Sequence, residues 1–222
     1  MVLVHAANPG RIWDLPQHEA IQAVMDRLGH VRRKTIRGTV HRAMYAKYLL
    51  SPGADPQPLY YKGSLSGRRF TPRMGPAGLY LSFDPSTPQA ELRAVIFEGG
   101  VPVSTSDHDP IITVAVRCAI HRILDVTDSD TRNLLDLTRA DLRSDWERRQ
   151  DEYLAGRAPM PATQLLALTA HASGLFAGIK YPSARTDFGV NLVVFPDRLR
   201  GSAGDFLEVV DSGNRFSQRL PP

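Results

Sequence analysis

The sequence contains a single cysteine, no long apolar run and no basic leader. Because Cys118 is alone, a disulfide within the chain is excluded and a reducing compartment is favoured. Its neighbours in residues 114–119 are typical of a strand, so we expect a buried, unreactive thiol. The longest apolar run, at residues 192–196, has the length of a strand and falls far short of the ~20 residues that cross a bilayer. With no secretory signal visible, these features predict a cytoplasmic protein that does not enter the membrane.

Motifs that bind nucleotides or metals are also missing. The sequence has no G-x-G-x-x-G and no Walker A motif, so the usual glycine loops give no argument for dinucleotide or triphosphate binding. Residues 63–67 resemble the nucleophile elbow of hydrolases, but Leu65 stands where the serine is required. Asp107, His108 and Asp109 are adjacent and cannot converge on one ion, so a loop tip is favoured and no metal is expected.

The composition is that of one globular domain, with or without a small appendage: 222 residues, 42% of them hydrophobic and 23% charged. Lys and Arg exceed Asp and Glu by 27 to 23, which gives a net charge of +4 and a pI of about 9.4. This small positive excess suits an anionic ligand. Because the basic residues are spread along the whole chain, binding of nucleic acid by this chain alone is not predicted.

The hydrophobic pattern divides the chain into an N-terminal helical extension, residues 1–38, and a main domain, residues 39–222. Asp14 is expected to cap a helix that ends at Gly29. An apolar stripe at i, i+3, i+4 and i+7 marks its buried face: Ile21, Val24, Met25 and Leu28.

In the main domain, short apolar segments without regular βαβ alternation predict an α+β fold and not a doubly wound sheet. Strands are expected at residues 39–42, 59–61, 79–81, 111–116, 120–126, 191–195 and 206–211. Helices are expected from residue 87, over 128–142, within 145–161 and over 165–176.

Two candidate ligand-binding residues lie between Gly67 and the strand at 79–81. Arg69 precedes Phe70 on a turn, and its planar guanidinium suits bidentate binding of a diphosphate. The alternative is an exposed loop arginine. Tyr80 either presents its ring to a nicotinamide or ribose, or is an ordinary core tyrosine.

Two further candidates are Glu91 and Ser183. Thr87 as N-cap and Pro88 at the first helical position open a helix that places Glu91 in its first turn, where the helix dipole favours a carboxylate in any case. In a cleft, the same carboxylate would stabilise the oxocarbenium-like cation that forms when a ribosyl C–N bond breaks. Ser183 is either a turn serine or a hydrogen-bonding partner of a phosphate or amide.

The order of these residues resembles the RES domain family, which is named for its Arg, Glu and Ser. In that family an early arginine precedes a glycine–arginine–aromatic turn, a strand with tyrosine, a helix with glutamate, a Tyr-Pro-Ser-like segment and a strand that begins with asparagine. The matching residues here are Arg42, Arg69, Tyr80, Glu91, Ser183 and Asn191. The resemblance spans roughly residues 39–200. It departs from the family at residues 1–38, at the proline-rich segment 51–58 and at Thr71, where many relatives have asparagine.

The resemblance implies a core similar to that of the ADP-ribosyltransferases, a split β-sheet with flanking helices. It also implies the toxin of a toxin–antitoxin system, which degrades NAD+ by cleaving the nicotinamide–ribose bond through hydrolysis or phosphorolysis. NAD+ is then the substrate, and no metal takes part. Catalytic roles fall to Glu91, Arg69, Tyr80 and Ser183, and NAD+ binding to Arg42, Arg69, Tyr80, Ser183 and Asn191.

The partner implied by the resemblance is an Xre-type antitoxin with a helix-turn-helix part, whose C-terminal segment blocks the cleft. DNA would be bound only through the antitoxin, and the toxin would form a homodimer at most within that complex. Two other functions stay open at this point. One is a mono-ADP-ribosyltransferase that modifies a cellular protein, and the other is a non-catalytic nucleotide-binding module.

Overall fold

The computed structural model describes residues 10–49, 57–61, 67–92, 95–98, 101–104, 110–210, 213 and 217–221. The described part is a mixed α+β fold, as expected, with one large and one small sheet. The large sheet has the order β1-β2-β7-β6-β5-β8-β9. Its strands are β1 (Lys34–Tyr45), β2 (Leu79–Ser82), β5 (Ile111–Asp125), β6 (Gly178–Pro182), β7 (Val190–Val194), β8 (Phe206–Val210) and β9 (Ser217–Leu220). The small sheet pairs β3 (Val95–Glu98) with β4 (Val101–Ser104).

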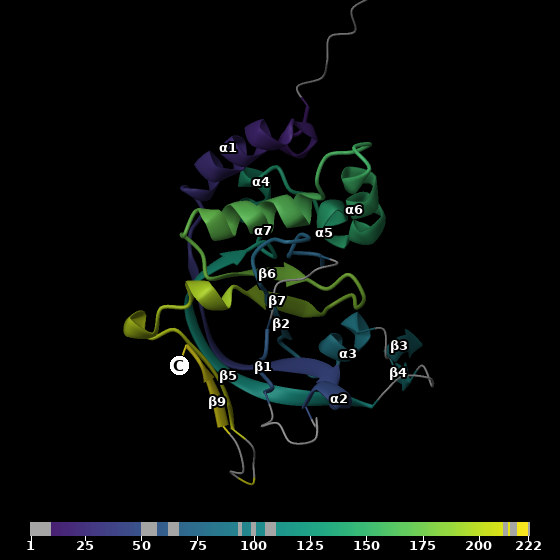
Figure 1. The fold of residues 1–222 in the computed structure, drawn as a ribbon, viewed down its shortest axis with the longest axis vertical. Helices are drawn as coiled ribbons and strands as arrows, with labels where there is room; N and C mark the ends of the chain where they lie inside the picture. Colours follow the sequence, from purple (N-terminus) through teal and green to yellow (C-terminus); the bar gives the residue numbers. More distant parts are fainter. Residues whose placement is uncertain are drawn as a thin grey trace, which may run out of the picture.

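The large sheet closes into a ring, because β1 pairs with β5 as well as with β2. β1, β2, β7, β6 and β5 form the ring, and the two long strands β1 and β5 curve beneath the rest of the molecule (Figure 1). The pairing of β5 with β6 is parallel, whereas the other pairings of this sheet are antiparallel. The register between β1 and β2 consists of one pair, His41 with Ser82.

The helices lie mainly on one side of this ring (Figure 1). They are α1 (Gln17–Leu28), α2 (Ala46–Leu49), α3 (Thr87–Glu91), α4 (Ser129–Leu134), α5 (Arg139–Arg143), α6 (Trp146–Leu154) and α7 (Ala162–Ala172), with the 3-10 turns η1 (Ile12–Asp14), η2 (Pro196–Arg198) and η3 (Gly201–Ala203). α1 packs on α7, which covers the strands, while α3 lies apart from this layer, against β1, β2, β5 and β7. Asp128, Thr138 and Asp145 cap α4, α5 and α6 with side-chain hydrogen bonds.

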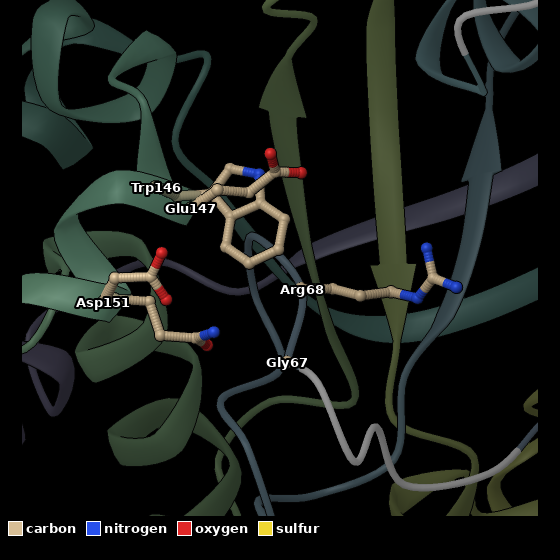
Figure 2. Close-up of a pocket in the computed structure, with 6 residues that line it drawn as sticks. Gly67, Arg68, Trp146, Glu147 and Asp151 are labelled. Atoms are coloured by element: carbon tan, nitrogen blue, oxygen red, sulfur yellow. The ribbon is translucent and has the colours of Figure 1, made fainter. Parts of the chain in front are cut away.

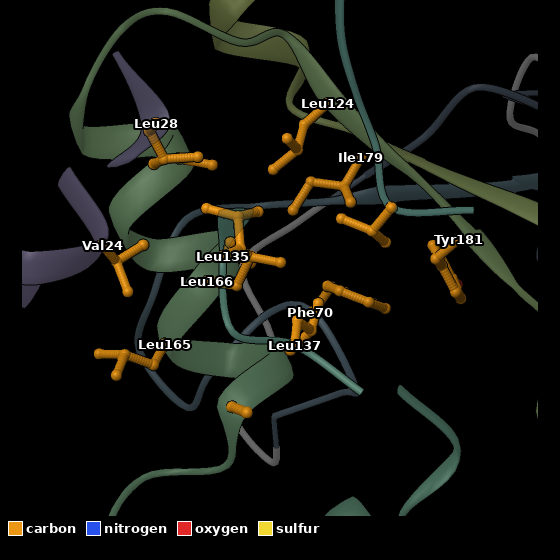
Figure 3. Packing of buried hydrophobic residues seen from close by; sticks show 14 of the residues in the cluster. Val24, Leu28, Phe70, Leu124, Leu135, Leu137, Leu165, Leu166, Ile179 and Tyr181 are labelled. Atoms are coloured by element: carbon orange, nitrogen blue, oxygen red, sulfur yellow. The ribbon is translucent and has the colours of Figure 1, made fainter. Parts of the chain in front are cut away.

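Alternation along the strands creates two hydrophobic cores. The helix-side core lies between the strands and the helix layer; it includes Leu28 of α1, Leu166 of α7, and Phe70, Leu124 and Tyr181 (Figure 3). The strand-side core lies on the opposite face and is built from Val40, Leu81, Val116, Ile120, Leu192 and Leu207, among others. Successive residues such as Ile123 and Leu124 therefore enter different cores, as the two-residue period of a strand requires.

Cys118 belongs to the strand-side core and is 3% exposed. Burial raises the pKa of its thiol to about 11, so the reactive thiolate is scarce at neutral pH. The prediction of a buried thiol on a strand is thus confirmed. Among the helices that the structure describes, none is long and apolar enough to cross a membrane.

Several predicted elements need correction. β1 begins five residues before the expected strand, and the two strands expected at 111–116 and 120–126 are the single strand β5. The helix expected over 128–142 is divided into α4 and α5, because Asp136 between them has a positive φ of 53°. α1 begins after Pro16, without a side-chain cap, so Asp14 is not its N-cap.

Residues 59–61 do not form the expected strand. Leu59 is fully buried in the strand-side core, and its backbone N–H donates to Gln218 Oε1 at 2.6 Å. Tyr60 and Tyr61 are exposed. The segment thus covers the core through one side chain and does not join a ladder. The loop expected at 51–58 lies almost wholly outside the described residues.

The segment before residue 39, expected as an extension, shares the core of the main domain. α1 buries Ala20, Val24 and Leu28 in the helix-side core, and Trp13 Nε1 donates to the Asp136 carbonyl at 2.7 Å. β1 itself crosses residue 39 without interruption.

Truncation of Leu28 should therefore destabilise the whole domain. Leu28→Ala removes a side chain that is 1% exposed and should lower the free energy of unfolding by about 2–5 kcal/mol. His18→Ala on the exposed side of α1 is the control, and it should change stability by less than about 0.5 kcal/mol. Urea unfolding followed by circular dichroism measures both. Equal stability of the two variants would mean that α1 is a dispensable appendage.

Candidate functional site

Four side chains form a row across adjacent strands of the ring. His41 of β1 is paired with Ser82 of β2, Ser82 with Asn191 of β7, and Asn191 with Tyr181 of β6. Directly opposed residues of antiparallel strands point to the same face of a sheet. This cross-strand row therefore lies on one face, the face on which Tyr181 enters the helix-side core.

Glu91, the last residue of α3, is fixed on this row. Its Oε1 accepts a hydrogen bond from Asn191 Nδ2 and another from Ser183 Oγ, both at 2.7 Å. Asn191 is held in turn, because its Oδ1 accepts from Ser82 Oγ at 2.5 Å. Among the described residues, none donates to Glu91 Oε2. One carboxylate oxygen is thus committed to the framework.

The hydroxyl of Ser183 is fully used. It donates to Glu91 and accepts from the backbone N–H groups of Arg185 (3.0 Å) and Thr186 (3.1 Å), which completes its one donor and two acceptor positions. Ser183 is also 1% exposed. The structure therefore makes Ser183 an orienting partner of the carboxylate. For Ser183 to act as a nucleophile or to contact a phosphate directly, one of these hydrogen bonds would have to break.

α3 is held by Asp84, and not by the expected N-cap Thr87. Asp84 Oδ1 accepts from the N–H groups of Ser86 (3.1 Å) and Thr87 (2.8 Å), and Oδ2 accepts from Thr87 Oγ1 at 2.6 Å. Ser86 occupies the N-cap position, but its hydroxyl donates to Asp84 Oδ1 at 2.7 Å and does not cap the helix, which starts with Thr87 and Pro88. Because α3 has only five residues, Glu91 lies at its end, and the dipole argument for an acidic first turn does not apply.

Tyr80 lies on the same face as the cross-strand row, two residues before Ser82. Its hydroxyl accepts from the Phe70 N–H at 3.0 Å and shares a hydrogen bond with Thr71 Oγ1 at 3.1 Å. Although part of the residue remains accessible, burial of the phenol raises its pKa to about 12. Tyr80 thus holds the turn that carries Arg69. Burial also raises the pKa of Tyr181 well above its ordinary value, with the charges of Tyr80 and Glu91 adding to the effect.

Arg69 is near Glu91 but is partly committed to the fold. One terminal guanidinium nitrogen donates to the carbonyls of Leu142 (2.7 Å) and Ser144 (3.0 Å) at the end of α5. Burial lowers the pKa of Arg69, while the neighbouring Tyr181 and Glu91 act in the opposite direction. The guanidinium is therefore within electrostatic range of the carboxylate.

Buried amides fix the backbone beside Arg69. Gln164, 1% exposed, donates to the carbonyl of Arg68 at 2.9 Å and to Gln150 Oε1 at 2.8 Å. Gly67 has a φ of +80° and approaches Gln150 so closely that a Cβ there would lie 2.0 Å from Oε1. The arginine turn is consequently a rigid part of the domain.

Arg42 is not brought to this cluster. It follows His41 on β1, so it points to the opposite face, where its strand neighbour Val114 packs on the strand-side core. Its guanidinium donates to the Pro58 carbonyl at 2.6 Å. Burial, together with the charge of Arg68, lowers the pKa of Arg42 to about 10. Its role in binding NAD+ stays a prediction.

Three members of the cross-strand row were not predicted: His41, Ser82 and Tyr181. His41 and Ser82 have a plain strand environment in the sequence, and Tyr181 was noted only as the first residue of the Tyr-Pro-Ser-like segment. The signal that could have found them is the pairing of β1, β2, β7 and β6, which are far apart along the chain.

A hollow of about 320 Å³ lies beside the arginine turn, and Figure 2 shows its lining. It is formed by Gly67, Arg68, Trp146, Glu147, Gln150 and Asp151. The Arg68 side chain extends away from Trp146 and Asp151 in this view. The carboxylates of Glu147 and Asp151 in this lining are unfavourable for a diphosphate. Glu91 and its partners Ser183 and Asn191 do not line the hollow. We therefore place the candidate site around Glu91, because of the chemistry of its side chains, and not at this hollow. The described residues contain no group of three or more His, Cys, Asp and Glu placed to hold a metal ion.

Comparison with known proteins agrees with a mixed α+β domain. No curated protein matches the chain. Among solved structures, a chain of the crystal structure of the M. tuberculosis MbcT–MbcA toxin–antitoxin complex has a similar fold, with a TM-score of 0.53 and 16% identity over 90% of this chain and 92% of that chain. The profile of the RES domain family matches residues 39–209. The chain belongs to the RES domain family, which confirms the resemblance drawn from its motifs.

Removal of the Asp84 carboxylate should loosen α3. Although burial acts to raise the pKa of Asp84, hydrogen bonds from Thr87 and Ser86 outweigh it and hold the pKa below its ordinary value. Asp84→Ala should lower the free energy of unfolding by about 1 kcal/mol at neutral pH, as the loss of a helix cap does.

The pH dependence of this effect has a defined sign. Because the folded-state pKa is depressed, the stabilisation is present above the unfolded-state pKa of about 3.9 and is lost as pH falls through the folded-state pKa. The difference in free energy of unfolding between wild type and Asp84→Ala, measured with urea, should therefore become smaller in acid. Asp187→Ala, at a largely exposed ion pair, should show little effect at either pH. An equal difference in stability at neutral and acid pH would contradict the proposal that ionised Asp84 stabilises α3.

Proposed function

We propose that this chain is an NAD+-consuming toxin that cleaves the bond between nicotinamide and ribose. The observation that carries the proposal is the carboxylate of Glu91, with Oε1 fixed by Ser183 and Asn191 and Oε2 not bonded by any described residue. A preorganised negative charge of this kind is what a developing ribosyl cation requires. Membership of the RES domain family supports the same chemistry, because its members resemble NAD+-acting enzymes.

The reaction breaks the glycosidic C–N bond of the nicotinamide ribose. The electron pair leaves with nicotinamide, and the ribose carbon becomes cationic and planar in an oxocarbenium-like state. Glu91 stabilises this cation through Oε2, while its two fixed hydrogen bonds keep the carboxylate from turning away. Water or phosphate then adds to the ribose carbon and gives ADP-ribose or its phosphate ester.

The basic residues around the carboxylate suit the diphosphate of NAD+. Arg69 lies within electrostatic range of Glu91, and Arg185 is near enough to lower the pKa of Arg69. With one guanidinium nitrogen of Arg69 bound to carbonyls of the fold, its remaining donors are preoriented for a phosphate oxygen. We infer that the ring of strands corresponds to an ADP-ribosyltransferase-like core.

The proposed partner is an antitoxin of the Xre type that covers the cleft, with DNA bound by the antitoxin. The solved structure with the similar fold is a toxin–antitoxin complex, which supports a partner of this kind. Phe188, 97% exposed, lies in the loop between β6 and β7 that begins at Ser183. A protein that blocks the site would cover this apolar side chain.

Glu91→Gln should remove most NAD+ consumption and preserve the fold. Glutamine keeps an acceptor oxygen for Ser183 and Asn191 but loses the charge, which should lower the rate by ~10²–10³. Glu19→Gln makes the same exchange on α1, where the side chain is 52% exposed, and should leave the rate unchanged. The assay is NAD+ loss with time, with matched circular dichroism spectra.

Activity of Glu91→Gln within about threefold of wild type would reject Glu91 as the catalytic carboxylate. Mass spectrometry of the products, with and without phosphate, identifies the acceptor. Free ADP-ribose indicates water, its phosphate ester indicates phosphate, and a modified protein indicates the ADP-ribosyltransferase alternative.

Expression of the wild-type chain alone should arrest bacterial growth and deplete cellular NAD+. Co-expression of the cognate antitoxin should restore both, because a protein that fills the cleft competes with NAD+ for the same charged groups. The Glu91→Gln chain is the control, and it should be harmless at equal abundance. Normal growth and NAD+ levels with folded wild-type protein would favour the non-catalytic module.

A further inference from the structure

His41 stands in the cross-strand row with a polar atom that the fold does not satisfy. Its imidazole points to the same face as Ser82, the residue opposite it on β2. Nδ1 of His41 is shielded from solvent and makes no hydrogen bond with any described residue. Buried polar atoms without partners are rare in folded proteins, and they call for an explanation.

Histidines elsewhere in the chain show what a structural role requires. His121 uses both ring nitrogens, Nδ1 with Asp205 Oδ1 at 3.0 Å and Nε2 with an Arg37 guanidinium nitrogen at 3.2 Å. His171 Nε2 is paired with Asp197 at 2.7 Å. Packing alone therefore does not account for the unpartnered Nδ1 of His41.

The position of His41 connects it with the carboxylate. Ser82 lies beside it and donates to Asn191, which donates to Glu91. α3, which carries Glu91, packs against β1 as well as β2. His41 is thus at one end of the cross-strand row, and Glu91 is bonded to Asn191, two strands further along the same row.

We infer that His41 is a substrate-binding residue of this site: a turn of its side chain on binding brings Nδ1 to a polar group of the nicotinamide or its ribose. This inference rests on the proposed NAD+ chemistry. A ribose hydroxyl or the nicotinamide carboxamide has the donors and acceptors that an imidazole nitrogen can pair with. β1 then contributes to the site through His41, since Arg42 points to the opposite face.

Three substitutions of His41 separate the two ring nitrogens. Asparagine places an amide group near the position of Nδ1, glutamine places it near Nε2, and leucine has no polar group. His41→Asn should keep kcat/KM for NAD+ within about threefold of wild type, whereas His41→Gln and His41→Leu should lower it by about tenfold to a hundredfold. NAD+ binding, measured by calorimetry on the Glu91→Gln background, should weaken in the same order.

The control is His18→Leu, an exposed histidine of α1, which should leave kcat/KM and binding unchanged. Thermal melting of every variant tests for a purely structural role. If His41 were only structural, its substitutions would change the melting temperature, but the folded variants would all have the same kcat/KM. That result, with an active wild type, would overturn the assignment of His41 and leave the proposed function intact. A wild-type chain that neither consumes nor binds NAD+ would overturn the proposed function, and the assignment of His41 with it.

Discussion

The two hydrogen bonds that converge on Glu91 Oε1 constrain the rest of the site. They come from Ser183 and Asn191, which lie about a hundred residues further along the chain, at the end of β6 and in β7. The carboxylate is fixed only if β2, β7 and β6 are in register, because Asn191 must also meet Ser82. The position of one charge therefore depends on the closed ring of strands, and the ring depends on the two cores that cover its faces.

α3 is the weakest part of this arrangement. Its five residues are far fewer than an isolated helix needs, so its position depends on packing against the strands, on Asp84 at one end and on the bonds to Glu91 at the other. The turn that carries Arg69 is held more firmly, by hydrogen bonds with Tyr80, Gln164 and the end of α5. The hydrogen bonds at both ends of this short helix therefore decide where the carboxylate lies relative to Arg69.

The sequence allowed the elements nearest the site to be predicted, because their signals are local. The strands that became β2 and β7 are short runs rich in aliphatic residues, and Glu91, Ser183 and Asn191, which the structure brings together, were proposed from the order of their motifs. His41 and Tyr181 were not among the predicted site residues, because their place in the row comes from pairing between distant strands, which no local pattern encodes. Arg42 was assigned to the site from its motif, but alternation on β1 turns it to the other face.

The most direct measurement is a crystal structure of the Glu91→Gln protein with NAD+ bound. The account predicts that the nicotinamide ribose lies on the cross-strand row, against residue 91 and within hydrogen-bonding distance of His41, with the diphosphate toward Arg69. NAD+ in the hollow between Arg68 and Trp146, with the row untouched, would contradict it.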